Sequence, residues 1–230
     1  MDILQAGGVG IIPTDTCYSF VTQINNAEGI KRILHLKDEG MKKPLSLLCK
    51  DIATISRYSS NLCDQKWVFK ILKNSLPGPY TYILPSSKEV PSILVDHKKH
   101  MRRWKRREIG VRIPHDAICA SILQDVGDAL ISGSVPEFRE DEDIGLVDGL
   151  KPEDTSLEAS DLSPGLPNSG AQKIAWMGRW LDRVDFIVES DERVGSHEVE
   201  GRSTVVDLTS GDAVVLRKGK GRSDIFSERT

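Results

Sequence analysis

The sequence lacks the features that mark several large classes of protein. Its four cysteines, Cys17, Cys49, Cys63 and Cys119, form no Cys-x-x-Cys pair, and its five histidines are scattered. Disulfide frameworks and zinc sites need cysteines or histidines at characteristic spacings. We therefore expect core thiols in a reducing compartment and no tightly bound metal. No apolar run approaches the roughly 20 residues that span a bilayer, so no membrane partner is expected.

The chain also lacks a large excess of positive or negative charge, since the net charge of its 230 residues is only -3. A polyanion would have to bind local clusters. Neither a GxxxxGK[ST] phosphate loop nor a nucleophile-plus-base motif is present, and no catalytic residue is assigned. The first residues, MDILQAGGVG, do not resemble a signal peptide. We expect a cytoplasmic protein, or an organellar one if the chain is a trimmed precursor.

Short apolar runs and amphipathic stretches alternate along the chain. The apolar runs predict strands at 8–13, 45–49, 80–84, 109–113, 129–132, 185–189, 203–208 and 213–219. The amphipathic stretches predict helices from a cap at Asn25 and Asn26 to Lys37, after a cap at Asp51, and at 61–73, 117–126 and 171–183. Strands alternating with helices predict an α/β sheet with helices on both faces.

Two segments break this alternation. Residues 97–108, HKKHMRRWKRRE, form a dense basic run, whereas residues 136–170 are acidic, rich in Pro, Gly and Ser, and without clear periodicity. Such composition is typical of a loop or insertion. We therefore predict one domain over residues 1–230 that carries a basic insertion at about 97–108 and an acidic, mobile insertion at about 136–170.

Hydroxyl groups and single cations recur at the ends of the predicted strands. They are Thr14, Thr16, Lys37, Lys43, Arg112, Ser132, Ser134, Ser203 and Arg217. In α/β sheets ligands tend to lie beyond strand ends, and hydroxyl, ammonium and guanidinium groups there suit phosphate and carboxylate oxygens. Taken singly, each residue also has a structural interpretation, as a turn hydroxyl or a solvated edge-strand charge.

Several motifs in the same order carry a family resemblance. They are PTDT at 13–16, LK-x6-PLSLL at 36–48, LPGPYTYILPSS at 76–87, GVRIPHDAIC at 110–119, LISGS at 130–134, STVVDL at 203–208 and VLRKGKG at 215–221. This order resembles the YrdC-like family of L-threonylcarbamoyl-AMP synthases. The resemblance implies a twisted mixed sheet with a positively charged concave surface. It also implies a reaction of ATP, with Mg²⁺, L-threonine and bicarbonate to give threonylcarbamoyl-adenylate for N6-threonylcarbamoyladenosine in tRNA.

The resemblance also implies residue roles. It places Thr14, Thr16 and Arg112 at the threonine end of the site. Nucleotide-binding roles fall to Lys37, Lys43, Ser132, Ser134, Ser203 and Arg217, with Lys37 in the position of the family's Lys-x-Arg lysine. In-line attack on the α-phosphate requires mainly positioning and charge stabilisation, which such residues can supply.

The sequence departs from the family at two of these motifs. Lys-x-Arg becomes Lys37-Asp38-Glu39, and the Asn of Ser-x-Asn becomes Pro136. An acid in place of a cation beside a polyphosphate costs at least ~2 kcal/mol, or more than tenfold in affinity. Lys42 and Lys43 are the candidates to compensate. Together with PLSLLCKDI, these departures resemble most the YciO branch of the family, and they leave catalysis, and its direction, open.

The basic run supports a hypothesis from a different class. Arg102, Arg103, Arg106 and Arg107 suit phosphate backbones, and Trp104 suits stacking on a base. Three interpretations are therefore open. The first is a nucleotidyltransferase-type protein acting on ATP or threonylcarbamoyl-adenylate, in the forward, reverse or hydrolytic direction. The second is a non-catalytic module of the same fold that binds tRNA or double-stranded RNA. The third is a partner-binding protein that uses the acidic insertion.

Overall fold

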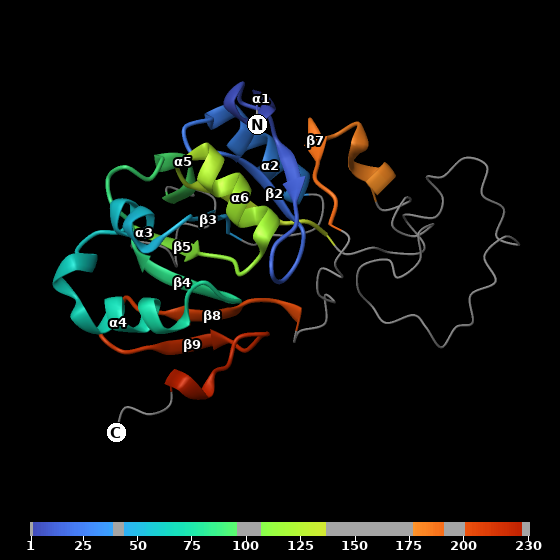
Figure 1. Ribbon diagram of the computed structural model, residues 1–230. Helices are drawn as coiled ribbons and strands as arrows, with labels where there is room; N and C mark the ends of the chain where they lie inside the picture. The colour runs from blue at the N-terminus through green and yellow to red at the C-terminus, as the bar shows by residue number, and fades with distance from the viewer. Residues whose placement is uncertain (1, 39–43, 96–106, 137–176, 191–200, 227–230) are drawn as a thin grey trace, which may run out of the picture.

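The protein is built on a mixed sheet of nine strands in the order β7-β1-β2-β6-β3-β5-β4-β8-β9 (Figure 1). The structure is a computed structural model that describes residues 2–38, 44–95, 107–136, 177–190 and 201–226. The strands are β1 (Gly10–Ile12), β2 (Ser19–Gln23), β3 (Ser46–Leu48), β4 (Tyr80–Pro85), β5 (Glu108–Arg112), β6 (Leu130–Ser134), β7 (Phe186–Ile187), β8 (Thr204–Asp207) and β9 (Val214–Arg217).

Parallel and antiparallel pairs mix within this sheet. At its centre β6 runs antiparallel to both β2 and β3, while β3 runs parallel to β5. Next to them β4 pairs antiparallel with β5 and parallel with β8. The closing strands β8 and β9 form the antiparallel pair that the sequence predicts.

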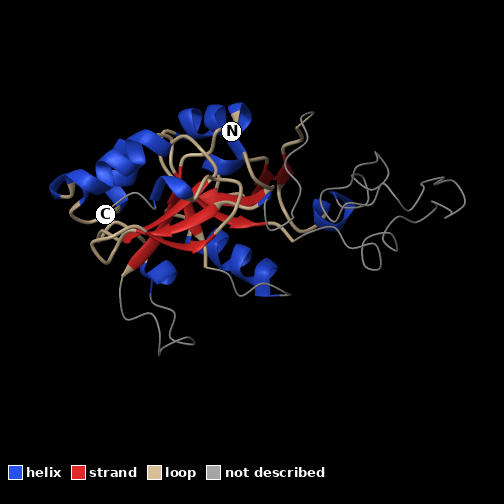
Figure 2. Cartoon of the chain, turned by 90° about the horizontal axis from the view of Figure 1, so that it is seen from below, coloured by secondary structure: helices blue, strands red, loops and turns tan. Residues whose placement is uncertain are grey.

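Helices lie on both faces of the sheet (Figure 2). They are α1 (Asp2–Gln5), α2 (Ala27–Asp38), α3 (Ile52–Tyr58), α4 (Lys66–Ser75), α5 (Ser92–Val95) and α6 (Ala117–Val126), with short 3-10 turns η1 (Leu62–Asp64) and η7 (Asp224–Phe226). The larger core packs α2, α3 and α4 on one face, and a smaller core packs α1 and α6 on the other. The predicted α/β class with helices on both faces is confirmed.

Local capping explains where two of these helices begin and end. Asp51 accepts a hydrogen bond from the Thr54 N–H at 2.6 Å at the start of α3, and Asp116 accepts one from the Cys119 N–H at 2.7 Å at the start of α6. Gly127 ends α6 with a left-handed φ of 75°, which glycine adopts without the steric cost of a β-carbon. The predictions of the Asp51 cap and of the 117–126 helix are confirmed.

The main difference from the predicted elements is β2. The sequence SFVTQ carries polar residues at positions 19, 22 and 23, and no strand was predicted there. Ser19 and Thr22 are nevertheless buried, because β2 pairs with both β1 and β6, and the Thr22 hydroxyl donates to the Gly8 carbonyl at 3.0 Å. The predicted 61–73 helix is also divided, into η1 and α4, at Gln65.

The remaining segment predictions fall partly outside the described residues. Of the basic insertion, residues 97–106 lie outside them, as do residues 137–170 of the acidic one, while the predicted 171–183 helix is described as helical at 177–181. Cys17, Cys49 and Cys119 are free and buried, so for these residues the prediction of core thiols is confirmed. Burial raises the pKa of the Cys119 thiol to about 12. Within the described part of the chain, no helix is long and apolar enough to cross a membrane.

The Asp51 cap generates a stability prediction. Hydrogen bonds from the Thr54 hydroxyl and backbone N–H lower the pKa of Asp51. A lowered folded-state pKa means that the charged cap stabilises the protein above the ordinary carboxyl pKa and loses this contribution as pH falls through the folded-state value. We expect Asp51→Ala to lower the free energy of unfolding at neutral pH by about 1 kcal/mol, measured by urea denaturation.

Asp51→Asn provides the matched control, because asparagine caps helices as well as aspartate but carries no charge. We expect Asp51→Asn to keep most of the stability at pH 7 while losing part of the decrease between about pH 5 and pH 2. Equal stability of the alanine and wild-type proteins at pH 7 would contradict the cap assignment.

Candidate functional site

Small polar residues from neighbouring strands line one face of the sheet. The Ser46 hydroxyl in β3 lies 3.1 Å from that of Ser132 in β6, and the Thr81 hydroxyl in β4 lies 2.8 Å from that of Ser203. Between them, a β-carbon added to Gly110 in β5 would lie 3.2 Å from Thr81 Cγ2 and 3.3 Å from Ser46 Cβ. These residues therefore share one face, and we call them the hydroxyl row.

The hydroxyl row is partly exposed at Ser46, Gly110 and Thr81 and buried at Ser132 and Ser203, which are 2% and 6% exposed. Ser46, Gly110 and Thr81 are partly exposed, whereas the residues that follow each of them along the strand, Leu47, Val111 and Tyr82, are 0% exposed. Successive side chains of a strand point to opposite faces. The row faces the side that α1 and α6 cover over Leu48 and Leu130, since these lie two residues from Ser46 and Ser132.

Cations gather beside the row, at its β5–β4–β8–β9 end. Arg112 in β5 is 5% exposed. Arg217 in β9 donates from Nη2 to the Ser203 carbonyl at 2.8 Å and to the Ser203 hydroxyl at 3.1 Å. Arg202, just before β8, and Lys220, after β9, complete what we call the cation cluster. Because the hairpin and β5 lie on either side of β4, residues far apart in the sequence converge here.

The loop after β1 joins this cluster. Nη2 of Arg112 donates to the Thr16 hydroxyl and to Asp15 Oδ1, both at 2.8 Å. The Thr14 hydroxyl donates to the Cys17 carbonyl at 2.6 Å and lies 3.2 Å from the Thr16 hydroxyl. The structure therefore brings together Thr14, Thr16 and Arg112, which the sequence predicts to act as one group.

The electrostatics of the cluster favour an anion. Burial, followed by repulsion from Arg202 and Arg112, lowers the pKa of Arg217. Asp15 offsets part of this positive charge through its ion pair with Arg112, in which both side chains are 6% exposed. The Arg112 Nε–H is buried and has no hydrogen-bond partner among the described residues. An unpaired buried donor costs roughly 1–3 kcal/mol, a cost that an anionic oxygen would remove.

The remaining predicted nucleotide residues do not all join the row. Ser134 lies at the end of β6 on the same face as Ser132, opposite Ser19 in register. Lys37 lies on the other face, since a β-carbon on Gly133 would be 2.8 Å from Lys37 Cδ and 3.1 Å from its Nζ. Lys37 is only 3% exposed. The sheet thus separates Lys37 from the hydroxyl row.

Most of the predicted RNA-binding group cannot be placed. Arg102, Arg103, Trp104 and Arg106 lie outside the described residues, as does the predicted nucleotide residue Lys43. Arg107 is exposed, and its carbonyl accepts a hydrogen bond from the Ser86 N–H at 2.7 Å.

Sequence reasoning missed several members of the site. Asp15, Ser46, Thr81, Arg202 and Lys220 all lie in or beside the motifs that carry the resemblance, yet none was assigned a role. Alternation provides a signal for Ser46 and Thr81, because each is a small polar residue flanked by apolar ones in a strand. Asp15 and Lys220 meet only through the fold, with the Lys220 ammonium 2.7 Å from the Asp15 carbonyl.

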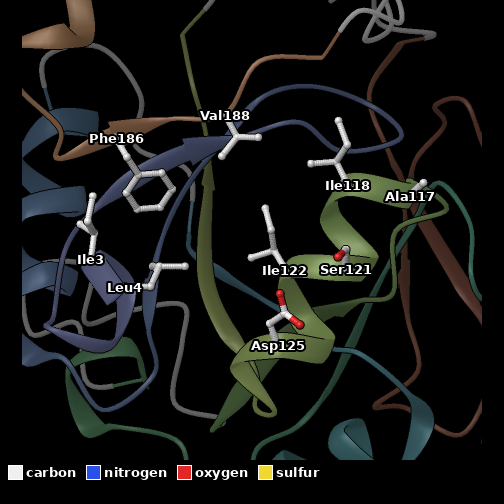
Figure 3. A pocket seen from close by; sticks show the side chains of 9 residues that line it. All are labelled: Ile3, Leu4, Ala117, Ile118, Ser121, Ile122, Asp125, Phe186 and Val188. Carbon is white, nitrogen blue, oxygen red and sulfur yellow. The ribbon is translucent and has the colours of Figure 1, made fainter. Parts of the chain in front are cut away.

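A second concavity has a different character. It has a volume of about 550 Å³ and lies between α1, α6 and β7, where Ile3, Ile122 and Phe186 are among its apolar lining residues (Figure 3). Ser121 and Asp125 are its polar ones, and none of the described residues that line it is a cation. The pocket therefore does not suit an anion. Among the described residues, no group of His, Cys, Asp and Glu could hold a metal ion.

This chain is similar to a known protein family and to relatives with solved structures. The family model Sua5_yciO_yrdC, whose description is "Telomere recombination", matches residues 2–143. The uncharacterized protein YciO of Escherichia coli (strain K12) is 27% identical over 223 residues, which are 96% of this chain and 87% of YciO. The crystal structure of E. coli YciO is similar to this structure with a TM-score of 0.68 at 26% identity. The match covers 98% of this chain and 89% of the YciO chain.

Synthases and their structures are also similar to this chain. A threonylcarbamoyl-AMP synthase of Chromobacterium violaceum is 30% identical over 131 residues, which are 57% of this chain and 63% of the synthase. The crystal structure of P. abyssi Sua5 complexed with L-threonine has a TM-score of 0.65 at 18% identity, over 94% of this chain and 52% of Sua5. This last likeness shows a shared fold.

The cation cluster predicts specific stabilisation by polyvalent anions. We expect about 10 mM pyrophosphate to raise the midpoint of thermal unfolding by about 3–6 °C over chloride at the same ionic strength, if its Kd is about 1 mM. Arg217→Gln should reduce this increment at least by half. Arg57→Gln is the matched control, because Arg57 is an exposed arginine of α3 paired with Glu89 at 2.6 Å. Equal increments in the two variants would argue against the cluster as the binding site.

Proposed function

Because this chain belongs to the Sua5/YciO/YrdC family, we propose that it binds an adenylate across the hydroxyl row and the cation cluster. The adenylate that the family's synthases indicate is threonylcarbamoyl-AMP, with ATP, L-threonine and bicarbonate as its precursors. The protein thereby takes part in chemistry linked to N6-threonylcarbamoyladenosine in tRNA.

One observation carries this proposal. Arg112 is buried beside Arg217 and Arg202, and its Nε–H has no partner among the described residues. Burying like charges together is costly unless opposite charge compensates them, and Asp15 offsets part of this charge through its ion pair with Arg112. An adenylate supplies that compensation through its phosphate. The threonine carboxylate of threonylcarbamoyl-AMP supplies a second anionic group to the same end of the site.

The hydroxyl row suits the rest of such a ligand. Ser132, Ser46, Thr81 and Ser203 are short side chains that both donate and accept hydrogen bonds. Gly110, between them, has no side chain, and the side chains of Thr81 and Ser46 approach each other over it. A row of small groups across several strands can hold an extended ligand, while Arg112 and Arg217 fix its charged groups.

The reaction does not require a covalent intermediate with the protein. Attack of a carbamate oxygen on the α-phosphate, or of water in the hydrolytic direction, is accelerated mainly by positioning and by stabilising phosphate charge. Mg²⁺ enters with the nucleotide as part of the substrate. The cation cluster supplies the fixed positive charge that either direction requires.

We expect the departures at Glu39 and Pro136 to lower the affinity for a triphosphate more than the affinity for a monophosphate. An acid repels a substrate in proportion to its charge, and ATP carries more negative charge than an AMP ester. This difference favours threonylcarbamoyl-AMP over ATP as the ligand, and therefore the hydrolytic or reverse direction over synthesis.

The test is a pair of parallel reactions with the purified full chain. One contains ATP, Mg²⁺, L-threonine and bicarbonate, and the other contains preformed threonylcarbamoyl-AMP and Mg²⁺, either with pyrophosphate for the reverse direction or without it for hydrolysis. We expect breakdown of the adenylate to exceed its formation. Chromatography of the nucleotides measures both reactions, and release of pyrophosphate measures formation. Absence of both reactions and of adenylate binding would remove the enzymatic proposal. It would favour the RNA-binding module, for which loss of RNA affinity on neutralising Arg102, Arg103, Arg106 and Arg107 is the corresponding measurement.

Restoring the family's residue provides a second prediction. Glu39→Arg replaces an acid with the arginine that the family's Lys-x-Arg motif carries at this position. We expect it to strengthen ATP binding more than tenfold, and AMP binding by less, in calorimetric titrations. Glu189→Arg provides a control with the same charge change at an exposed position after β7. An equal gain in both variants would attribute the effect to net charge alone.

A further inference from the structure

Asp15 occupies a junction between three parts of the chain. Its Oδ1 accepts from Arg112 Nη2 at 2.8 Å, its Oδ2 accepts from the His115 N–H at 3.0 Å, and its carbonyl accepts from Lys220 Nζ at 2.7 Å. The loop after β1, the end of β5 and the end of the closing hairpin therefore meet at one residue. The side chains of Asp15 and Arg112 are both 6% exposed, so their ion pair is largely shielded from water, whereas the contacts with His115 and Lys220 lie at exposed positions.

The described hydrogen bonds of the Arg112 guanidinium come from Nη2 and not from Nε. Nη2 donates to both Asp15 Oδ1 and the Thr16 hydroxyl at 2.8 Å, whereas the buried Nε–H has no partner among the described residues. A guanidinium is a rigid planar fork, so fixing Nη2 also fixes the direction in which Nε–H points. The orientation of the unpaired donor is thus set by Asp15 and Thr16.

We infer that Asp15 is a positioning residue, which holds Arg112 so that its Nε–H meets an anionic oxygen of the bound ligand. This inference rests on the proposed function for the identity of the ligand, but not for the geometry of Arg112. The oxygen belongs either to the threonine carboxylate or to the phosphate of the adenylate. Both are anionic acceptors, and separate probes distinguish them.

Removing the charge of Asp15 changes anion affinity in opposite directions if Asp15 positions Arg112 and if it acts only as a negative charge. Asp15 carries negative charge in a cluster that attracts anions, so Coulomb's law alone predicts that removing this charge strengthens anion binding. Positioning predicts the opposite, because a free Arg112 loses the orientation of its Nε–H. A purely structural role predicts lower stability with unchanged affinity.

The chain offers a matched control. Asp185 also pairs with an arginine, Arg32, at 2.7 Å and also accepts a backbone hydrogen bond, from the Val9 N–H at 2.7 Å. It lies beside β7, at the far edge of the sheet from the cation cluster. Asp185→Asn therefore removes an equivalent charge and equivalent contacts without touching the site.

The experiment titrates the full chain with inorganic phosphate, AMP and L-threonine separately by calorimetry. We expect Asp15→Asn to weaken at least one of these about tenfold, and Asp185→Asn to change none by more than about twofold. Weakening confined to threonine assigns the oxygen to the carboxylate, and weakening of phosphate and AMP assigns it to the phosphate. Unchanged or tighter binding of every probe by Asp15→Asn would overturn the inference.

Arg112→Lys gives a second line of evidence that does not require Asp15→Asn to fold, because lysine keeps the charge and lacks the fork. We expect it to lose a similar affinity for the same probe. Where Asp15→Asn folds, we expect no further loss in the double variant Asp15→Asn/Arg112→Lys, since both act through one guanidinium. Additive losses would reject the positioning role. A wild type that bound phosphate but neither AMP nor threonine would refute the proposed function alone, whereas binding none of the three would reject the inference as well.

Discussion

The alternation of side chains along the central strands is the constraint on which the rest of the structure depends. In β3, β5, β4 and β8, one set of residues enters the larger core and includes Leu47, Val111, Tyr82 and Val206, all 0% exposed. The residues between them form the hydroxyl row and lead to Arg112. Because the period is two, a slip of one residue would bury the row and expose the core, so the same burial that stabilises the sheet fixes the site.

This arrangement places binding and stability in opposition at the cation cluster. Arg112 and Arg202 both repel Arg217 in a partly buried setting, and Asp15 offsets part of this charge through its ion pair with Arg112. The apolar face can carry that cost because a fully buried aliphatic or aromatic side chain contributes about 1.5–3 kcal/mol. A protein that keeps such a costly group of charges is poised to gain free energy when an anion binds.

How much was predictable from the sequence depends on how local each feature is. The Asp51 cap and the α6 boundary at Gly127 follow from neighbouring residues, and both were predicted correctly. Strand β2 was missed because the burial of Ser19 and Thr22 comes from pairing with β1 and β6, which no local pattern shows. In the site, the resemblance gave Thr16 and Arg112, but not Asp15 with Lys220, whose contact joins residues 205 positions apart.

The position of Lys37 changes how the departures from the family motif should be weighed. The structure holds Lys37 across Gly133, on the face of β6 away from the hydroxyl row. The described cations of the cluster come instead from β5 and from the closing hairpin, so they are fixed by the sheet itself. The positive charge of Arg112, Arg202, Arg217 and Lys220 therefore does not depend on the residue at position 39. The departure at Glu39 is compatible with the adenylate site that we propose, because that site takes its described cations from elsewhere in the chain.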